Sequence, residues 1–171
     1  DPGPETALAL DEFERSFWES LAAGTSPDPV MAAVATTVRE CRIDDECFTR
    51  FFGAMRSDLT RRTYETWGDL LGYMDGSAAV IGEMMLPILE PRSPEAIGPA
   101  RDLGIAFQLT NFLRDIDEDL DRNRQYIPQD DLNRFGVDLT DRRCTPAFVE
   151  LMKFEIDRTR DQGDIRSRSP C

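Results

Sequence analysis

Two aspartates, Asp115 and Asp119, stand four residues apart, just after an apolar segment that also carries the amides Gln108 and Asn111. On a helix this spacing puts both carboxylates on one face, one turn apart, where like charges repel and destabilise a bare helix. A divalent cation reverses the sign of that contribution. Mg²⁺ prefers hard oxygen ligands and commonly takes one or two carboxylates, with water and phosphate oxygens completing its shell. The pattern therefore indicates a metal-bridged diphosphate site, at which the two amides can also form hydrogen bonds.

The four-residue spacing alone is not specific, because other acid pairs of the chain share it and fit an ordinary solvated face, namely Asp117/Asp121 and Asp157/Asp161. The residues around Asp115 and Asp119 distinguish this pair from the others. On a helical wheel, one arc of roughly 80° holds Gly104, Gln108, Asn111, Asp115, Asp119 and Arg122. A second polar side, beyond an apolar arc, carries Arg114 and the remaining acids. A surface helix needs only one polar face, so we expect the first arc to line a cavity, with Arg124 and Tyr126 just past the helix beside it.

The composition of the chain limits which kinds of binding and catalysis are possible. The 171 residues carry a formal charge of -13, from 33 acids against 20 bases, which argues against general binding of nucleic acid or anionic membranes. No histidine is present, which excludes Ser-His and Cys-His nucleophilic machinery and His-ligated zinc within the chain. The four cysteines form no CxxC pattern and are typical of reduced thiols. Acid-base or metal chemistry must therefore rest on Asp, Glu, Tyr, Arg or Lys.

Helical periodicity dominates the elements that must position these residues, and no stretch alternates long enough to predict a sheet. No segment reaches the roughly 18 apolar residues of a membrane-spanning helix, and the N-terminus lacks a signal peptide's basic start. Caps and prolines predict where helices begin and end. The expected helices cover about residues 8–23, 29–42, 44–61, 66–89, 93–122 and 145–160, with residues 128–138 as a loop containing a short helical turn. The prediction is one all-α domain.

The segment LGIAFQLTNFLRDIDEDLDRNRQYIP, residues 103–128, resembles the second aspartate-rich signature of the squalene/phytoene synthase family over its whole length. The matching positions are Leu103, Gly104, Gln108, Asn111, Arg114, Asp115, Asp119, Arg124, Tyr126 and Pro128. Upstream, YMDGSAAVIGEMMLPI is similar to the family's Tyr-to-Gly helix, at Tyr73, Ser77, Ala78, Ala79, Val80, Ile81 and Gly82. QLTNFLRD followed by YIPQDDL is closer to bacterial phytoene synthases than to squalene synthases.

This resemblance implies part of an isoprenoid-synthase-type helical bundle with a central cavity. It also implies a Mg²⁺-dependent transferase, with Mn²⁺ as a substitute, that condenses two prenyl diphosphates head to head. In carotenoid biosynthesis, two geranylgeranyl diphosphates would give phytoene through a cyclopropyl diphosphate. The implied catalytic residues are Asp115, Asp119, Tyr73, Arg124 and Tyr126. The implied substrate-binding residues are Gln108, Asn111, Arg114, Ser77, Val80 and Gly82, and the implied metal ligands are Asp115, Asp119 and Asn111.

The small residues from Gly76 to Gly82 have two readings that the sequence leaves open. They permit close helix packing, or they leave room for a long isoprenoid chain with Val80 and Ile81 as an apolar wall and Tyr73 near the reacting carbons. The resemblance further implies a cytoplasmic monomer with prenyl diphosphate substrates and no nucleic-acid partner. Peripheral membrane association would serve product release.

The chain departs from the family in extent. Family members carry two aspartate-rich motifs on facing helices, and only the second is present here, so we expect the first to lie before Asp1 and the C-terminal helices to be missing. Residues from about 160 to 171 are expected to be disordered. We therefore expect a partial domain that is inactive alone, within an active parent. Two alternatives remain open: a squalene or dehydrosqualene synthase that uses farnesyl diphosphate, and a non-catalytic family member acting in assembly.

Overall fold

The structure, a computed structural model, describes residues 3–164, and these residues form helices and loops without a β-strand. In chain order the elements are α1 (Pro4–Ala23), α2 (Pro29–Cys41), α3 (Asp45–Thr60), α4 (Trp67–Met74), the π-helical turn η1 (Asp75–Ala79), α5 (Val80–Leu89), the 3₁₀ turn η2 (Pro94–Ala96), α6 (Ile97–Arg114), α7 (Ile116–Asp121), α8 (Gln129–Phe135), the 3₁₀ turn η3 (Leu139–Asp141) and α9 (Pro146–Gly163). The expected all-α class is confirmed.

Local capping explains where several of these helices begin. The Asp28 carboxylate accepts hydrogen bonds from the amides of Val30 and Met31 at 2.8 and 3.0 Å, and so satisfies two of the free amides at the start of α2. At the start of α4, Thr66 and Asp69 form a capping box, in which each side chain accepts from the backbone amide of the other residue. Side-chain caps encoded in the sequence therefore fix these starts.

Two helices that the sequence predicts as continuous are interrupted. The expected helix over residues 66–89 contains η1, a π-helical turn that separates α4 from α5. The expected helix over residues 93–122 starts with the 3₁₀ turn η2 and breaks at Asp115, whose φ of -102° and ψ of 15° are not helical. A π-helical turn inside an α-helix is rare and often marks a functional site. Both interruptions lie beside residues that the sequence singles out.

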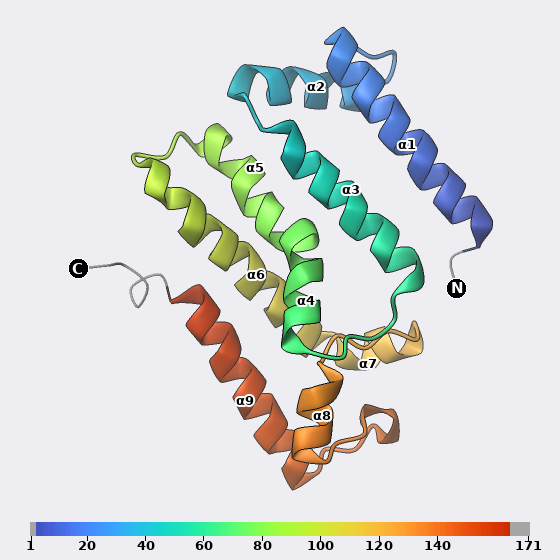
Figure 1. Cartoon of the computed structure of the whole chain (residues 1–171), viewed down its shortest axis with the longest axis vertical. Helices are drawn as coiled ribbons and strands as arrows, with labels where there is room; N and C mark the ends of the chain where they lie inside the picture. Colours follow the sequence, from blue (N-terminus) through green and yellow to red (C-terminus); the bar gives the residue numbers. More distant parts are fainter. Residues whose placement is uncertain (1–2, 165–171) are drawn as a thin grey trace.

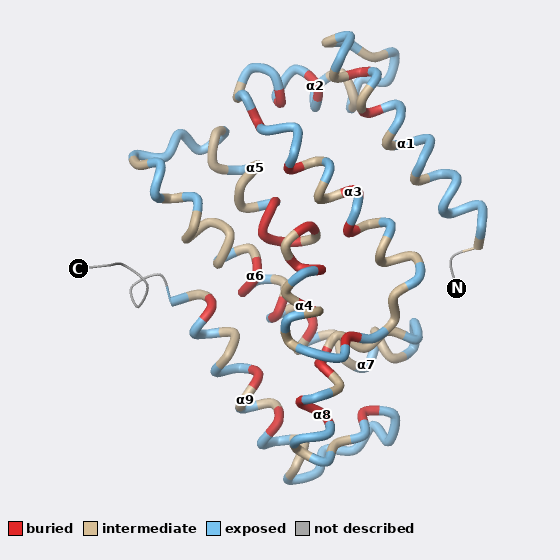
Figure 2. The backbone as a smooth tube through the Cα atoms, viewed as in Figure 1, coloured by how far each residue is buried: buried red, intermediate tan, exposed pale blue. Residues whose placement is uncertain are grey.

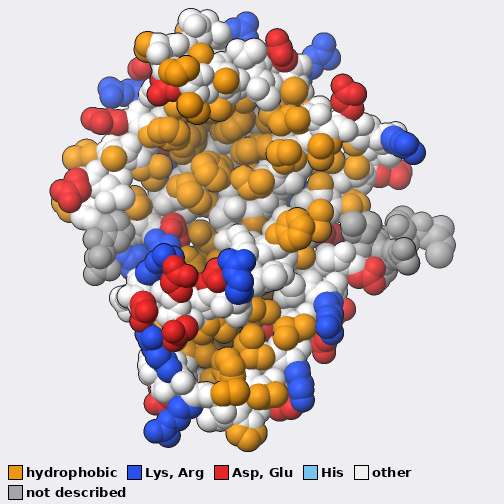
Figure 3. Space-filling view, turned by 180° about the vertical axis from the view of Figure 1, so that it is seen from behind, with side chains coloured by type: hydrophobic (Ala, Val, Ile, Leu, Met, Phe, Trp, Pro, Cys, Tyr) orange, Lys and Arg blue, Asp and Glu red, His pale blue; other side chains and the backbone are white. Residues whose placement is uncertain are grey.

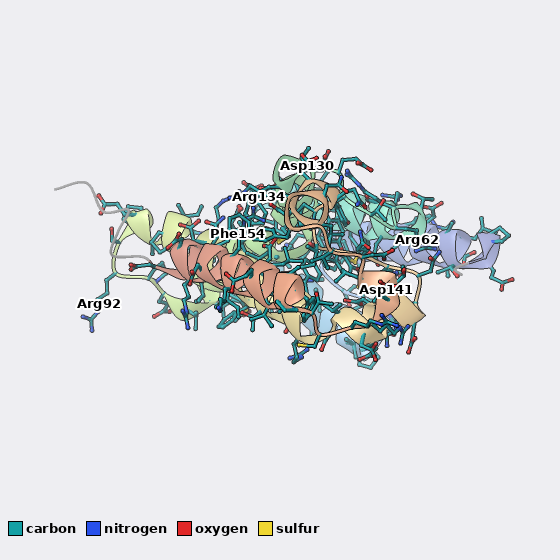
Figure 4. All side chains as sticks on the ribbon, turned by 90° about the horizontal axis from the view of Figure 1, so that it is seen from below. Arg62, Arg92, Asp130, Arg134, Asp141 and Phe154 are labelled. Carbon is teal, nitrogen blue, oxygen red and sulfur yellow. The ribbon has the colours of Figure 1, made fainter. Side chains whose placement is uncertain are left out.

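The long helices lie side by side as a single layer, in the order α1, α3, α4–α5, α6 and α9, while α2 crosses the top of the layer (Figure 1). Consecutive helices of the layer run in opposite directions; short loops join α3 to α4 and α5 to η2 and α6, whereas α2 lies between α1 and α3, and α7 and α8 lie between α6 and α9. Figure 4 shows from below that α8 packs on the lower end of α9, where Arg134 lies over the ring of Phe154 at 4.7 Å.

The core follows the middle of this layer, where α3, α4, η1 and α6 meet (Figure 2). Its most enclosed side chains include Tyr64, Leu70 and Met74, at 1%, 2% and 0% exposure. Three glycines bring the helices this close. A Cβ on Gly76 would clash with the Arg50 carbonyl of α3, one on Gly82 with the Ala100 carbonyl, and one on Gly104 with the Ala78 carbonyl. Close helix packing, one of the two readings of the small-residue segment, is therefore what the structure shows at Gly76 and Gly82.

An ionic network joins α3, η1, α5 and α6 beside these glycines. Arg50 contacts Asp75 at 3.2 Å and Glu83 at 2.5 Å, and Arg101 pairs with the same two acids. Glu83, which interrupts an apolar segment of the sequence, is only 12% exposed and has both arginines as partners. The charges of this network compensate one another, so a partly buried carboxylate is tolerated in the apolar surroundings.

Apolar side chains cover much of the opposite face of the layer (Figure 3). On α5, Ile81, Met85 and Leu89 are 41%, 42% and 67% exposed, and their spacing puts them on one side of the helix. On α6, Leu103 and Phe107 are 41% and 64% exposed at the same spacing. An apolar area of this extent indicates a surface for a ligand or for other protein. Despite it, the described helices are all too short or too polar to traverse a bilayer.

The final helix extends to Gly163, so residues 160–163 are helical and the expected disorder does not hold for them. Glu155 of this helix is buried and bonded to Arg158, which keeps the helix against α8 through Asp131. The rest of the expected disordered tail, residues 165–171, lies outside the described residues. Cys41, Cys47 and Cys144 are free thiols, in line with the sequence analysis, and Cys171 falls in the tail.

Candidate active site

The acidic pair is held one turn apart across the break at Asp115. The Asp115 amide donates to the Asn111 carbonyl at 2.9 Å, and the Asp119 amide donates to the Asp115 carbonyl at 2.8 Å. Both hydrogen bonds are of the helical type, although the backbone of Asp115 is not helical. The break therefore ends α6 without disturbing the four-residue spacing on which the predicted metal site depends.

The two carboxylates have different surroundings. Arg114 donates to both oxygens of Asp115, at 2.7 and 2.6 Å, and this pairing lowers the pKa of the Asp115 carboxyl. Partial burial raises the pKa of Asp119, and the negative charge of Asp115 raises it further. Asp119 forms no salt bridge with any residue in the described range. The pair thus contains one compensated carboxylate and one that lacks a direct counter-ion.

This donor set fits a hard divalent cation in kind and in number. Within residues 3–164 no group of three or more acids or cysteines is arranged to hold a metal ion. Mg²⁺ does not need one, because one or two carboxylates suffice when water and phosphate oxygens supply the remaining ligands. A cation at this position would also remove the repulsion that raises the pKa of Asp119.

The four residues that accompany the acidic pair in the predicted polar stripe have three different surroundings. Gln108 and Asn111 are half-buried, and their side chains form no hydrogen bond to another described residue. Gly104 packs against the Ala78 carbonyl, so the expectation that it lines a cavity is wrong. Arg122 points to solvent and pairs with Glu118 at 2.5 Å. Only the two amides therefore continue the acidic face inward, and both are free to bind a ligand.

Asp58, near the C-terminal end of α3, joins the other predicted catalytic residues. One of its oxygens, Oδ1, accepts from the hydroxyls of Tyr73 at 3.2 Å and Tyr126 at 3.4 Å. The other, Oδ2, lies 2.8 Å from the Arg124 guanidinium. Tyr73 comes from α4, whereas Arg124 and Tyr126 follow α7. The structure thus brings these three predicted residues together around a carboxylate that the sequence analysis did not single out.

Aromatic stacking holds the two tyrosines. The Tyr126 ring lies parallel to Phe112 of α6, with 3.8 Å between centroids and an interplanar angle of 7°. It also stacks on Tyr64 and Tyr73, at 5.9 and 6.1 Å. Burial, followed by the negative charge of Asp58, raises the pKa of Tyr73 and of Tyr126. Both phenols are therefore neutral hydrogen-bond donors at physiological pH.

The acidic pair reaches this aromatic cluster through Asp119. Asp119, Arg124 and Tyr126 line one small cavity of about 10 Å³, whose remaining lining is apolar except for Gln125 and includes Phe112 and Leu120. The negative charge of Asp119 acts across this pocket, because it adds to the effects of burial and Asp58 that raise the pKa of Tyr126. The metal-binding candidates and the tyrosine cluster are consequently parts of one site.

The upstream segment contributes less directly than expected. Val80 is fully buried in the core, so a ligand on the surface of the layer does not reach it, whereas its neighbour Ile81 is exposed. Gly82 packs closely against the Ala100 carbonyl, so this contact takes the space next to its Cα. The Ser77 hydroxyl is buried and has no partner among the described residues. Of the three, Ser77 alone has an unsatisfied polar group, and Ile81 fits an apolar wall better than Val80 does.

Sequence reasoning missed Asp58 and Tyr64. Asp58 stands in RSDLTRR, where charged neighbours make it resemble any solvated acid at a helix end. Its role depends on contacts with residues 15 and 68 positions away. Tyr64 lies between Thr63 and Glu65 in a loop, and polar neighbours give no signal of its burial. No local pattern could have identified either residue.

Comparison with known proteins gives consistent results. The family model described as squalene/phytoene synthase matches residues 2–162. Among curated proteins, 15-cis-phytoene synthase from Synechocystis sp. is 36% identical over 92% of this chain, and phytoene synthase 1 from Arabidopsis thaliana is 35% identical over 91%. Among solved structures, squalene synthase HpnC from Alicyclobacillus acidocaldarius superposes with a TM-score of 0.84 at 32% identity over 95% of this chain. A dehydrosqualene synthase in complex with ligand gives 0.82 at 29% over 90%.

The match covers only part of each relative. The chain spans 52% of the Synechocystis protein and 39% of the Arabidopsis protein. It spans 64% and 55% of the two solved chains. Whatever the relatives do as whole proteins, the 171 residues correspond to about half of their length.

Proposed function

The chain belongs to the squalene/phytoene synthase family, and on that premise we propose that it supplies part of the active site of a prenyltransferase that condenses two prenyl diphosphates head to head. The proposed substrate is geranylgeranyl diphosphate and the proposed product is phytoene, formed through a cyclopropyl diphosphate. Activity is assigned to the whole protein that carries these residues, because they span about half of the relatives' length. The 171 residues alone are expected to be inactive.

One observation carries this proposal: Asp119 of the acidic pair shares a pocket with Arg124 and Tyr126, and Asp58 connects these two to Tyr73. Asp115 and Asp119, with Asn111 as an amide ligand, would hold Mg²⁺. The bound metal would neutralise the charge of a diphosphate and make it a better leaving group. The required donor types are present without histidine, which is consistent with a reaction that needs no protein nucleophile.

The remaining residues act on the two ends of the substrate. Gln108 and Asn111 have free amide groups for diphosphate oxygens, and Arg114 and Arg124, which are paired with Asp115 and Asp58, would supply positive charge. Ile81, Met85, Leu103 and Phe107 offer an apolar surface along which an isoprenoid chain can lie. Excluding water there matters, because a carbocation formed when the diphosphate leaves would be quenched by it. Tyr73, which belongs to the core cluster and donates to Asp58, would stand between the two ends of the substrate.

Substrate length separates this proposal from its alternative. The curated relatives quoted above are named phytoene synthases, whereas the solved structures are named squalene and dehydrosqualene synthases. A synthase that uses farnesyl diphosphate is therefore the second candidate. Incubating the whole protein with each labelled diphosphate plus Mg²⁺ distinguishes the two by the product, a C40 or a C30 hydrocarbon. Condensation of neither substrate would leave the third possibility, a non-catalytic member of the family.

A further inference from the structure

The Asp58 carboxylate is the point at which three separate segments of the chain meet. It lies two residues before the end of α3, and its side chain is 20% exposed. Each of its oxygens is used: Oδ1 accepts from two phenols, and Oδ2 is paired with a guanidinium. Arg124 closes the arrangement, since it also donates to the Asp58 backbone carbonyl at 3.4 Å and to the Tyr126 hydroxyl at 3.5 Å.

Packing and hydrogen bonding fix different degrees of freedom here. The stack of Tyr126 on Phe112 fixes the plane of the Tyr126 ring, and burial at 8% exposure fixes that of Tyr73. Neither determines where a hydroxyl proton points, because the O–H bond can take either of two orientations in the plane of the ring. The carboxylate determines it, since a charged acceptor forms the stronger hydrogen bond.

We propose that Asp58 is a positioning residue of the active site, whose carboxylate orients the hydroxyls of Tyr73 and Tyr126 and holds Arg124 beside them. The inference rests on the proposed function. A tyrosine hydroxyl has one proton, so a hydroxyl that donates to Asp58 presents only oxygen lone pairs to the other side. In the proposed reaction the intermediates are carbocations. Oriented lone pairs stabilise positive charge, whereas a hydroxyl proton aimed at the same place would not.

The tyrosine spectrum tests this arrangement without any assay of activity. The chain has only three tyrosines, and all of them belong to this cluster: Tyr64, Tyr73 and Tyr126. The intensity ratio of the tyrosine Fermi doublet in the Raman spectrum reports whether a phenol donates a strong hydrogen bond. Asp58→Asn replaces the charged acceptor by a neutral amide, so the ratio is expected to move toward weaker donation. Asp58→Glu restores the charge and should recover part of the change, and Asp157→Asn, at an exposed position of α9, should leave the spectrum unaltered.

The kinetic test uses the same variants in the whole protein with prenyl diphosphate and Mg²⁺. We expect Asp58→Asn to lower kcat on the order of 100-fold, since misplaced groups cost about that much, while KM changes by about threefold or less. Asp157→Asn should retain full activity. A purely structural Asp58 would lower the melting temperature but leave kcat and the spectrum as they are. An unchanged Raman ratio or an unchanged kcat in folded Asp58→Asn overturns the inference.

Two further outcomes are distinguishable. If the wild-type protein condenses no prenyl diphosphate, the proposed function fails, and the Raman ratio still decides whether Asp58 orients the hydroxyls. If Asp58→Asn does not fold, Tyr73→Phe and Tyr126→Phe remove the donors one at a time instead. Each is expected to subtract a hydrogen-bond-donor component from the doublet, and loss of an acceptor-only component from either variant would contradict the arrangement.

Discussion

The Arg124 guanidinium lies 2.8 Å from the Asp58 carboxylate, across 66 positions of sequence. This contact joins the end of α3 to the loop that leaves the acidic pair. The same loop is fastened by its backbone, since the Gln125 amide donates to the Arg62 carbonyl and the Gln129 amide to the Tyr64 carbonyl, both at 2.8 Å. The segment that carries Arg124 and Tyr126 is consequently held by the residues that follow α3, and the site depends on the packing of the layer.

Close packing at Gly104 gives a prediction about stability. Gly104→Ala places a methyl group against the Ala78 carbonyl, a rigid backbone atom. We expect the free energy of unfolding to fall by about 2 kcal/mol, measured by urea denaturation. Gly72→Ala is the matched control, because a Cβ there meets nothing within 4 Å. That variant should be more stable than wild type, by about 0.5–1 kcal/mol. Equal effects of the two substitutions would contradict the packing role.

Metal binding gives a second prediction. Mg²⁺ that binds the folded chain stabilises it, and the gain grows with concentration above the dissociation constant. We expect the melting temperature to rise with added MgCl₂ and to return after chelation. Asp115→Asn and Asp119→Asn should abolish the rise, and Asp157→Asn should keep it. An equal rise in all variants would mean that the ion binds elsewhere.

In the absence of metal, Asp119→Asn is not expected to lower the melting temperature. Burial and Asp115 raise the pKa of Asp119, so its ionised form is disfavoured in the fold. The neutral amide removes that repulsion, and we expect the variant to unfold at a temperature equal to or above that of wild type without Mg²⁺. A clear loss of stability would show that Asp119 has a structural role instead of a binding one.

Glu155 gives a prediction about pH. It is 3% exposed and shares Arg158 with Asp131, and burial raises its pKa from 4.5 to about 7. A raised pKa in the fold means that the stabilising contribution is complete below about pH 4.5 and is lost as the pH rises through about 7. The loss attributable to this group is roughly 3 kcal/mol. It is measured as the free energy of unfolding in urea across that range.

The comparison variant for this prediction is Glu155→Gln, which cannot ionise and should show a flatter profile. Asp119 also has a raised pKa and contributes in the same direction, so the difference between the two profiles isolates Glu155. Asp75, paired with Arg101 and Arg50, has a lowered pKa and titrates below this range. Parallel profiles for wild type and Glu155→Gln would rule out Glu155 as the source.

Helix positions were predictable from the sequence because their signals are local. Asp28, Asp44 and Thr66 cap the helices that follow them, as side-chain chemistry alone predicts. The breaks at η1 and Asp115 were not predictable, since apolar periodicity continues through both. At η1 the surroundings are tertiary, since Gly76 packs on α3 and Ala78 packs on Gly104 of α6.

In the candidate site, too, some residues could be identified from local sequence signals and others depend on tertiary contacts. Asp115, Asp119, Gln108 and Asn111 could be read from their spacing on one helix. The meeting of Tyr73 with Tyr126 and Arg124 could be expected only from resemblance, and Asp58 from neither. Gly104 lies on the predicted arc of the helical wheel but packs against the backbone of Ala78, because a wheel gives the direction of a residue and not what lies in that direction.

The most direct test of the proposed chemistry is Mg²⁺-dependent turnover of labelled geranylgeranyl diphosphate by the whole protein, compared between wild type, Asp119→Asn and Asp157→Asn. We expect a cyclopropyl diphosphate and a C40 hydrocarbon from wild type and from Asp157→Asn. We expect neither product from Asp119→Asn, whose far-ultraviolet circular dichroism should remain that of wild type. Turnover by Asp119→Asn at the wild-type rate, or loss of turnover in Asp157→Asn to the same degree, would contradict the assignment of the acidic pair.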